Sequence, residues 1–535
     1  MDYFESSMQH LLSELERIDL LIRAQVAQAR QIQSQDEQFR GLYISEQDID
    51  ALLARPIGSP HWFRAPGVSA QVETMCEHMN QDIERRKQTS MQQGVTLRLQ
   101  RLQQIFDLDR LQTDILLIAL AVELDLRYER MYAYLQDDVT RKRPSVDLVL
   151  NLLSQSAEAK LKARRHFSFD SSLFRKRLVE LVEEPSTPNP PLLAKYLKVD
   201  NRIAQYLLGD DVLDERIETY AIRHEPGEPL DNLLVHEDVR CSLTHFIENN
   251  VPAARLIVHL LGPYGVGRLV TAEALCRQRQ VPMLVVDLER INCESGGGCD
   301  TAFCLVQREA KLLGTAVYWK NFDRLLLQQD KGLFMSFERS LEDRPALTFL
   351  AGKQSWQPAD ALRDAPFARV DLSRPVFLER SQLWSAALIG GSTPSTELDV
   401  DALATKFKFT GGQIKDATAT AENLARLRDP ETAQIRLSDL YEASRLHSNQ
   451  KLNALARKIK PTQKWADIIL PEDRLEQLRE ICNHVRYHDQ VYGLWGFGRK
   501  LSYGKGLSVL FAGPSGTGKT MAAEIIAGDL GLELY

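Results

Sequence analysis

The chain has 535 residues, which is enough for roughly three to five domains. Hydrophobic residues make up 44% of it, which is sufficient for several buried cores and excludes a disordered protein. The net charge of −7 excludes a uniformly basic nucleic-acid binder. No stretch is long and apolar enough to cross a bilayer, and the acidic N-terminus lacks the pattern of a signal peptide. We therefore predict a cytoplasmic, multidomain α and α/β protein with no membrane partner.

The seven cysteines are scattered along the chain, as is usual for proteins of the reducing cytosol. Cys293, Cys299 and Cys304 cluster, but their spacing matches no zinc-binding pattern. We predict buried or loop thiols there, rather than a metal site.

Residues 1–90 are predicted to form an N-terminal helical region. Within residues 3–36, apolar residues recur at alternating gaps of four and three, as in a heptad. The stripe consists of Phe4, Met8, Leu11, Leu15, Ile18 and Ile22. Either a coiled-coil contact with another subunit or a helix packed on its own domain would produce it. The stripe weakens at Gln25, which favours the second interpretation.

Residues 91–222 combine helical patterns with short apolar runs that flank the segment PSTPNPP, from Pro185 to Pro191. Helices followed by such a hairpin indicate a winged-helix-like domain. Basic residues gather near it, namely Arg141, Lys142, Arg143, Arg164, Arg165, Arg175, Lys176 and Arg177. They are compatible with DNA binding. The interspersed acidic residues favour a solvated surface instead, and such domains also dock proteins.

From Leu256 onward, apolar strand patterns alternate with helical patterns, which is typical of a parallel sheet covered by helices. This predicts an α/β core over residues 230–375. Residues 376–455 are then predicted to form a helical lid, and a second core is expected over residues 460–535.

Near the end of the chain, LSVLFAGPSGTGKTMAAEIIAGDLG predicts a strand, a loop and a helix in that order. Its loop matches the pattern G-x-x-x-x-G-K-[ST] in full. The predicted nucleotide-binding residues are Gly513, Pro514, Ser515, Gly516, Thr517, Gly518, Lys519 and Thr520. The glycines let backbone amides approach phosphate oxygens, Lys519 adds a positive charge, and the Thr520 hydroxyl is the predicted Mg²⁺ ligand. The predicted cofactors are therefore ATP and Mg²⁺.

The first core contains a degenerate version of this loop, GPYGVGRL, at residues 262–269. Arg268 replaces the lysine, and Leu269 replaces the hydroxyl residue that would bind Mg²⁺. Lys320 and Asn321 fall where an acidic pair would be expected. We predict no hydrolysis here and a mainly structural role, with Asp323 as a surface or capping residue.

Hydrolysis at the intact loop would require an acidic pair on a later strand and an arginine from a neighbouring subunit. The sequence ends fifteen residues after Thr520. We therefore expect a chain truncated at Tyr535 or a partial gene, and no catalytic residue can be assigned.

Two phosphate-loop units in tandem resemble the AAA+ superfamily. The segment KFKFTGGQIKDATATA, residues 406–421, is similar to the lid segment that carries sensor 2, with Lys415 near its usual arginine. The segment WADIILPEDRLEQLREIC, residues 465–482, resembles the linker that cradles adenine. That resemblance implies that Asp467 and Ile468 lie beside the base.

Residues 126–150 and 471–535 narrow the resemblance to the AAA+ ATPases encoded with extracellular contractile injection systems. It implies a winged-helix domain, a degenerate first AAA unit and a second unit with an intact phosphate loop. It also implies a hexameric homo-oligomeric ring that acts on a protein client or injection particle by ATP hydrolysis, without a nucleic-acid partner. The alternatives are a non-catalytic nucleotide-sensing scaffold and a winged-helix DNA-binding regulator gated by ATP.

Overall fold

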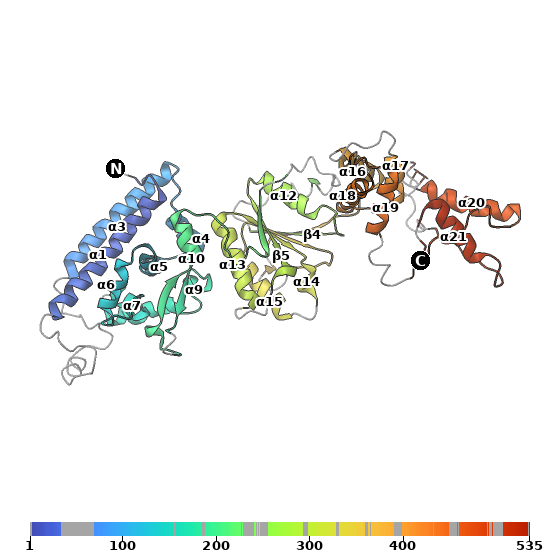
Figure 1. The fold of residues 1–535 in the computed structure, drawn as a ribbon. Helices are drawn as coiled ribbons and strands as arrows, with labels where there is room; N and C mark the ends of the chain where they lie inside the picture. The colour runs from blue at the N-terminus through green and yellow to red at the C-terminus, as the bar shows by residue number, and fades with distance from the viewer. Residues whose placement is uncertain are drawn as a thin grey trace. The chain divides into compact units, whose positions relative to one another are not determined.

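The computed structural model describes most of the chain, drawn in colour in Figure 1. The described residues are 3–33, 69–154, 156–184, 188–225, 227, 240–241, 243, 245–246, 255–292, 298–327, 331–358, 362–363, 365–389, 399–431, 433–448, 457, 459–488, 490–491, 495, 507–532 and 534–535. The chain divides into two compact units. The first comprises Met1–His224, Pro282–Val317 and Gln328–Pro345, and the second comprises Glu225–Val281, Tyr318–Leu327 and Ala346–Tyr535.

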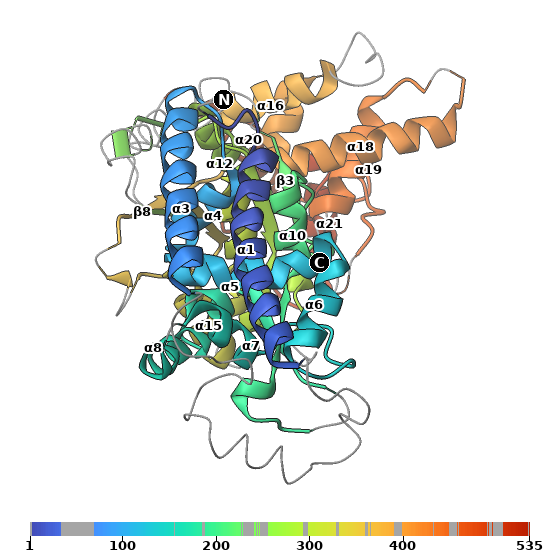
Figure 2. The ribbon, with the colours of Figure 1, turned by 90° about the vertical axis from the view of Figure 1, so that its left-hand side faces the viewer.

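The first unit begins with a group of helices. They are α1 (Ser7–Gln33), α3 (Ser69–Gln92), α4 (Arg98–Phe106), α5 (Arg110–Leu124), α6 (Arg127–Leu135) and α10 (Asn201–Leu208). Apart from α3, these helices share one hydrophobic core, whereas Ile83 of α3 packs with Phe4 and Leu97 in a smaller cluster. Helices α1 and α3 lie side by side in both ribbon views (Figures 1 and 2). The stripe residues Leu11, Leu15, Ile18 and Ile22 are buried in this core. The prediction that this helix packs on its own domain is thus confirmed.

A winged-helix arrangement follows within the same unit. Its helical part contains α7 (Val146–Leu153), α8 (Ala157–Ala163), the 3-10 turn η1 (Arg164–Phe167) and α9 (Ser172–Arg175). Strands β1 (Val179–Val182) and β2 (Tyr196–Val199) then pair antiparallel, with the short turn η2 (Leu192–Ala194) between them. An antiparallel bridge from Ser145 to Tyr196 adds a third short strand position. Helices followed by a two-stranded wing agree with the prediction from the sequence.

A six-stranded sheet has the order β3-β5-β6-β7-β4-β8. Its strands are β3 (Ala221–His224), β4 (Leu256–Leu261), β5 (Met283–Asp287), β6 (Ala316–Lys320), β7 (Leu347–Gly352) and β8 (Phe367–Asp371). Strand β4 runs parallel to β7 and β8, and all six residues of both β4 and β7 are buried. Strand β3 is antiparallel to β5. Continuous apolar runs such as LIVHLL are typical of strands covered on both faces, so the predicted α/β class is confirmed.

The segments between these strands are mainly helical. They are α12 (Arg268–Gln278), the 3-10 turn η4 (Leu288–Arg290), α13 (Gly298–Leu313), α14 (Asp323–Leu326) and α15 (Lys331–Leu341). Helix α13 packs on α15 within the first unit, where Phe303 and Phe337 make an edge-to-face contact at 5.3 Å. Within the described residues, no helix is sufficiently long and apolar to span a membrane.

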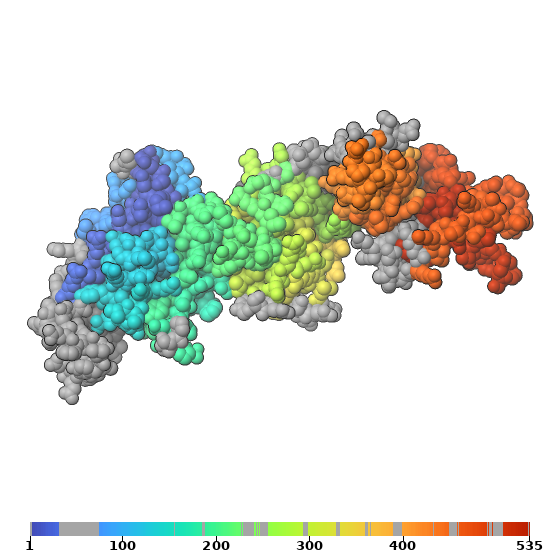
Figure 3. Space-filling model, in the orientation of Figure 1, coloured from blue at the N-terminus to red at the C-terminus, as the bar shows by residue number. Residues whose placement is uncertain are grey.

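The second unit contains a helical bundle after β8. Its helices are α16 (Phe377–Ile389), α17 (Val400–Lys406), α18 (Gly411–Arg428) and α19 (Leu437–Ser448), and we call it the lid. Their buried side chains, including Trp384, Leu403, Ile414 and Leu440, form one hydrophobic cluster. In the space-filling view the lid is a compact orange group of side chains (Figure 3). The predicted helical region is therefore present.

The final part of the second unit holds α20 (Glu472–Arg486) and α21 (Lys519–Leu530). The two helices share a small apolar cluster that includes Ile468, Leu478, Ala522 and Ile525.

The predicted strand before the phosphate loop is not formed. Residues 507–512 have no strand assignment, and Leu510 is 89% exposed. A strand requires a hydrogen-bonded neighbour, and no described segment pairs with these residues. Leu534 forms only an isolated antiparallel bridge with Ile459.

Candidate functional site

The intact glycine-rich loop adopts a backbone that only glycine tolerates well. Gly516 and Gly518 have φ angles of 84° and 81°, and Gly513 has a φ of 155°. Residues with a Cβ are strained in the left-handed region, whereas glycine enters it freely. Helix α21 starts at Lys519, directly after Gly518. The loop therefore leads straight into a helix N-terminus, where backbone N–H groups lack intrahelical partners and favour anions.

Lys519 places its charge inside this loop. Its Nζ donates to the carbonyl oxygens of Gly513 at 3.0 Å and Pro514 at 2.6 Å, and Thr517 Oγ1 donates to the same Pro514 oxygen at 2.9 Å. Among the described residues, no carboxylate pairs with Lys519. The ammonium charge is therefore held by neutral carbonyls, which leaves it available to an anion.

The space within the loop is open. A methyl group built on Gly516 or Gly518 would meet nothing within 4 Å. The Thr520 side chain is exposed on the first turn of α21, where its hydroxyl is accessible to a metal ion. The open space, the amides and the unneutralised ammonium fit a Mg²⁺-bound polyphosphate.

The predicted adenine contacts come from the segment before α20. Asp467 closes a turn, because its Oδ2 accepts the Lys464 N–H at 2.7 Å. Ile468 is buried against residues of α20 and α21, while its neighbour Ile469 is 96% exposed. The structure thus brings Ile468 to the helix that follows the phosphate loop. Contact of Asp467 and Ile468 with a base stays a prediction.

The degenerate loop keeps the backbone of the intact one. Gly262, Gly265 and Gly267 have φ angles of 155°, 73° and 102°, and α12 starts immediately afterwards, at Arg268. The two loops therefore differ in side chains rather than in backbone path. Sequence reasoning identified the glycine frame, and the structure adds that this frame still folds as a phosphate loop.

The positions after β6 where an acidic catalytic pair was expected hold Lys320 and Asn321, neither of which is a carboxylate. Lys320 is the exposed last residue of β6, and Asn321 follows with a positive φ of 62°. The Asp323 carboxylate accepts backbone N–H groups from Lys353 and Gln354, each at 2.7 Å. This confirms the prediction that Asp323 caps local backbone. Lys415, the predicted sensor position, is exposed on α18.

The cysteine prediction holds only in part. Cys304 is a free thiol whose Sγ donates to the Arg175 carbonyl oxygen at 3.3 Å. Cys299 is disulfide-bonded, contrary to the expectation of thiols, because linear spacing does not show which sulfur atoms meet in space. Cys293 lies outside the described residues. No cluster with the composition of a metal site occurs in the described part of the chain.

The basic residues near the winged helix do not form one free surface. Lys176 is buried and paired with Asp343, and the Arg177 guanidinium donates to Thr301 Oγ1 at 2.7 Å. Arg164 and Arg165 are exposed. Part of the basic group therefore binds other segments of the first unit.

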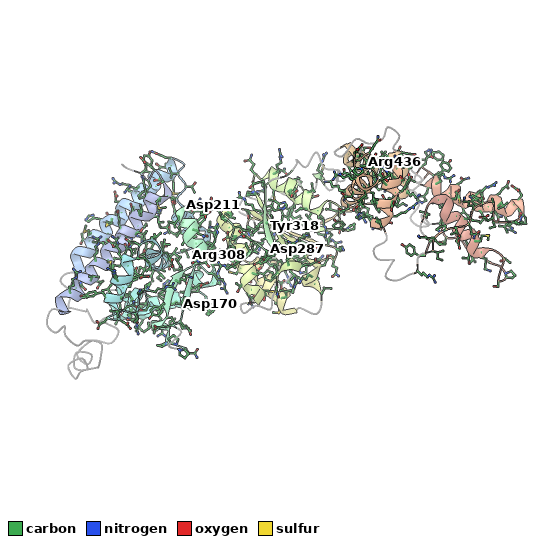
Figure 4. The ribbon with its side chains drawn as sticks, in the orientation of Figure 1. Asp170, Asp211, Asp287, Arg308, Tyr318 and Arg436 are labelled. Carbon is green, nitrogen blue, oxygen red and sulfur yellow. The ribbon has the colours of Figure 1, made fainter. Side chains whose placement is uncertain are left out.

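A buried charge network joins α13 to the residues after β2, and sequence reasoning missed it. Arg308, fully buried on α13 and labelled in Figure 4, donates to Asp214 Oδ2 at 2.7 Å and to the Arg177 carbonyl at 2.5 Å. Its neighbour Glu309 accepts from Arg202 Nε at 3.0 Å. Burial alone would raise the pKa of Asp214, but its hydrogen bonds and the nearby arginines hold that pKa below its usual value.

The same region contains a cavity of about 550 Å³ lined mostly by charged residues. Arg216 in its wall pairs with Asp200 at 2.8 Å and Asp214 at 2.7 Å. The Arg216 guanidinium therefore offsets part of the acidic charge of the lining, in which carboxylates outnumber basic side chains.

Comparison with known proteins agrees with this architecture. The family model "Winged helix domain, variant" matches residues 1–221, and the model "Contractile injection system ATPase helical domain" matches residues 377–450, which form the lid. The chain therefore contains a winged-helix domain and a helical domain similar to that of contractile injection system ATPases. These matches identify the two domains, whereas the phosphate loops are identified by their geometry.

Other similarities are more limited. The chain is 34% identical over 76 residues to "ATP-dependent zinc metalloprotease FtsH 1" of Sphaerobacter thermophilus; the match covers 14% of the chain and 11% of that relative. Two solved structures, from "Structural Basis for Katanin Self-Assembly" and "Crystal structure of FIGL-1 AAA domain", are 17% and 14% identical to it. Each match covers 44% of this chain, and 93% and 89% of those chains, with a TM-score of 0.35.

Proposed function

We propose that this chain binds Mg-ATP at Gly513–Thr520 and that, in a homo-oligomeric ring, ATP hydrolysis drives assembly or remodelling of an injection-particle protein. The main support is the loop itself. Its glycines adopt the required backbone, and Lys519 opens α21 with only carbonyl oxygens as described partners. The lid's match to contractile injection system ATPases supports the biological context.

Each residue of the loop has a separate task in this proposal. The amides from Gly516 to Thr520 point at phosphate oxygens, and the N-terminus of α21 adds its favourable dipole. Lys519 leaves the carbonyls of Gly513 and Pro514 to bind the terminal phosphates. Thr520 holds Mg²⁺ through its hydroxyl, and the metal ion neutralises phosphate charge. The base lies beside the backbone of Asp467 and Ile468.

The loop assignment is tested by calorimetric titration of the whole chain with Mg-ATP. We expect Lys519→Ala to weaken binding about 100-fold, since a charge-assisted hydrogen bond contributes roughly 1.5–3 kcal/mol. Arg268→Ala is the matched control, because Arg268 occupies the same position in the other loop. That control should leave the affinity unchanged. Equal affinities of Lys519→Ala and the unaltered chain would refute the assignment.

The ring and its ATPase activity are tested together. Analytical ultracentrifugation with Mg-ATP should show a higher-mass species that is absent from Lys519→Ala, and phosphate release should rise with that species. Nucleotide binding without phosphate release would instead favour the nucleotide-sensing scaffold. That alternative has its own support in the degenerate first core, where Leu269 and Lys320 replace the residues needed for chemistry.

A further inference from the structure

The first phosphate loop is in direct contact with the lid. The Gly412 N–H, in the first turn of α18, donates to the Gly265 carbonyl oxygen at 2.8 Å. The buried Thr410 hydroxyl caps α18 and donates to the Tyr264 carbonyl oxygen at 2.9 Å. Both loop carbonyls are therefore bound by the N-terminus of a lid helix.

The contact requires glycine on both sides. A Cβ built on Gly412 would lie 2.5 Å from Gly265 Cα, and one built on Gly265 would lie 2.7 Å from Thr410 Oγ1. Real Cβ atoms essentially never approach other atoms so closely, so either substitution must separate lid and loop. Gly411 differs, because its Cβ would be 3.5 Å from Leu383 Cδ2, an ordinary contact.

The Tyr264 side chain adds a further hydrogen bond between the first phosphate loop and the lid. Tyr264 occupies the position of Ser515 in the intact loop, and its hydroxyl donates to Asp416 Oδ2 on α18 at 3.0 Å. In the intact loop, by comparison, a Cβ on Gly516 would have open space within the described residues.

We propose that the first phosphate loop is a nucleotide-independent latch that holds the lid closed on its own core. In enzymes with mobile lids, ligand contacts draw the lid shut. Here hydrogen bonds from Thr410, Gly412 and Tyr264 take the place of that ligand. Because α18 contributes Ile414 and Ala417 to the lid core, the latch fixes the whole bundle. The first phosphate loop and the lid then form a rigid platform that does not respond to ATP.

Hydrogen–deuterium exchange of the whole chain, followed on peptides from residues 262–267 and 408–420, tests this latch. We expect Gly412→Ala to speed exchange in both segments by at least about tenfold. Gly411→Ala, one residue earlier in the same helix, should leave exchange unchanged or slow it, because alanine favours helix over glycine. Of the two neighbouring substitutions, only Gly412→Ala is thus expected to speed exchange.

Substitution of Tyr264 tests the latch with a smaller change to the structure, and it remains informative if Gly412→Ala does not fold. Tyr264→Phe removes only the hydroxyl, and we expect about fivefold faster exchange in the first turn of α18, the effect of losing a hydrogen bond of about 1 kcal/mol. Ser515→Ala is its matched control and should change nothing in these segments. Mg-ATP should not alter their exchange either.

Two results would overturn the latch. One is unchanged exchange in both Gly412→Ala and Tyr264→Phe. The other is slower exchange over residues 408–420 when Mg-ATP is added to Lys519→Ala, because the first loop would then bind nucleotide and the lid would respond. Neither result depends on the intact loop, so the latch and the proposed ATPase function can fail separately.

Discussion

His10 is fully buried in α1, where neither ring nitrogen has a hydrogen-bond partner among the described residues. Its Nε2 is 4.0 Å from Glu14 Oε1. Burial lowers the pKa of His10 from 6.5 to about 4, because loss of hydration disfavours the charged imidazolium. The nearby carboxylates of Glu14 and Glu84 oppose this shift, whereas the positive charges of Lys87 and Arg110 add to it. The folded chain therefore keeps this ring neutral at a pH at which the unfolded chain protonates it.

This difference predicts a pH dependence of stability with a definite sign. The contribution of neutral His10 is complete above pH 6.5 and is lost as the pH falls towards 4, because only the unfolded state then gains the proton. Each unit of the pKa difference corresponds to about 1.4 kcal/mol, so protonation of His10 in the unfolded state lowers the free energy of unfolding by roughly 3 kcal/mol. His10→Leu should abolish this pH-dependent loss. Urea denaturation at pH 7 and pH 4.5 measures it, with the exposed His78→Gln as control. An identical pH dependence in His10→Leu and the unaltered chain would contradict the prediction.

At the scale of single residues, the sequence predicts what depends on local pattern and misses what depends on distant partners. The eight residues from Gly513 to Thr520 are contiguous, so their spacing alone predicts the loop. Arg308 meets Asp214, which is 94 positions away in the chain. Nothing in a helical pattern indicates that pairing. The single indication in the sequence is that Arg308, a charged residue, falls on the apolar face of α13.

At the scale of elements, helices with a clear apolar stripe were predicted well. The strand at residues 507–512 was wrong, because strand formation depends on a neighbouring strand rather than on the segment's own apolar residues. The wing strands β1 and β2 are supported by pairing across residues 179–199 and therefore do form.

Helix α13 gives a prediction at this scale, because Arg308 attaches it to the segment that holds Asp214. Arg308→Met should destabilise the first unit by about 3 kcal/mol, since it leaves a buried carboxylate with one fewer positive partner. Adding Asp214→Asn should recover part of that loss. Urea denaturation of both variants measures the two effects, with Arg339→Met, an exposed arginine on α15, as control. If Arg308→Met costs no more than that control, the network does not stabilise the unit.

At the scale of the whole molecule, two loops with one backbone form differ in three chemically important side chains. Tyr264, Arg268 and Leu269 stand where the intact loop has Ser515, Lys519 and Thr520. The unaltered chain should therefore bind one Mg-ATP tightly, and Lys519→Ala should bind it about 100-fold more weakly. If backbone amides are already placed by Gly265 and Gly267, restoring the side chains should restore a site.

The restored chain carries Tyr264→Ser, Arg268→Lys and Leu269→Thr in the Lys519→Ala background, which leaves the first loop as the site under test. We expect calorimetry to detect tighter Mg-ATP binding than in the single Lys519→Ala variant. Leaving Leu269 in place should weaken it, because leucine cannot hold Mg²⁺. No binding by the restored chain would mean that the residues around the loop, beyond its own side chains, exclude nucleotide from the first phosphate loop. Binding would show instead that nucleotide recognition was lost through side chains alone, while the fold that once served it was retained as a platform.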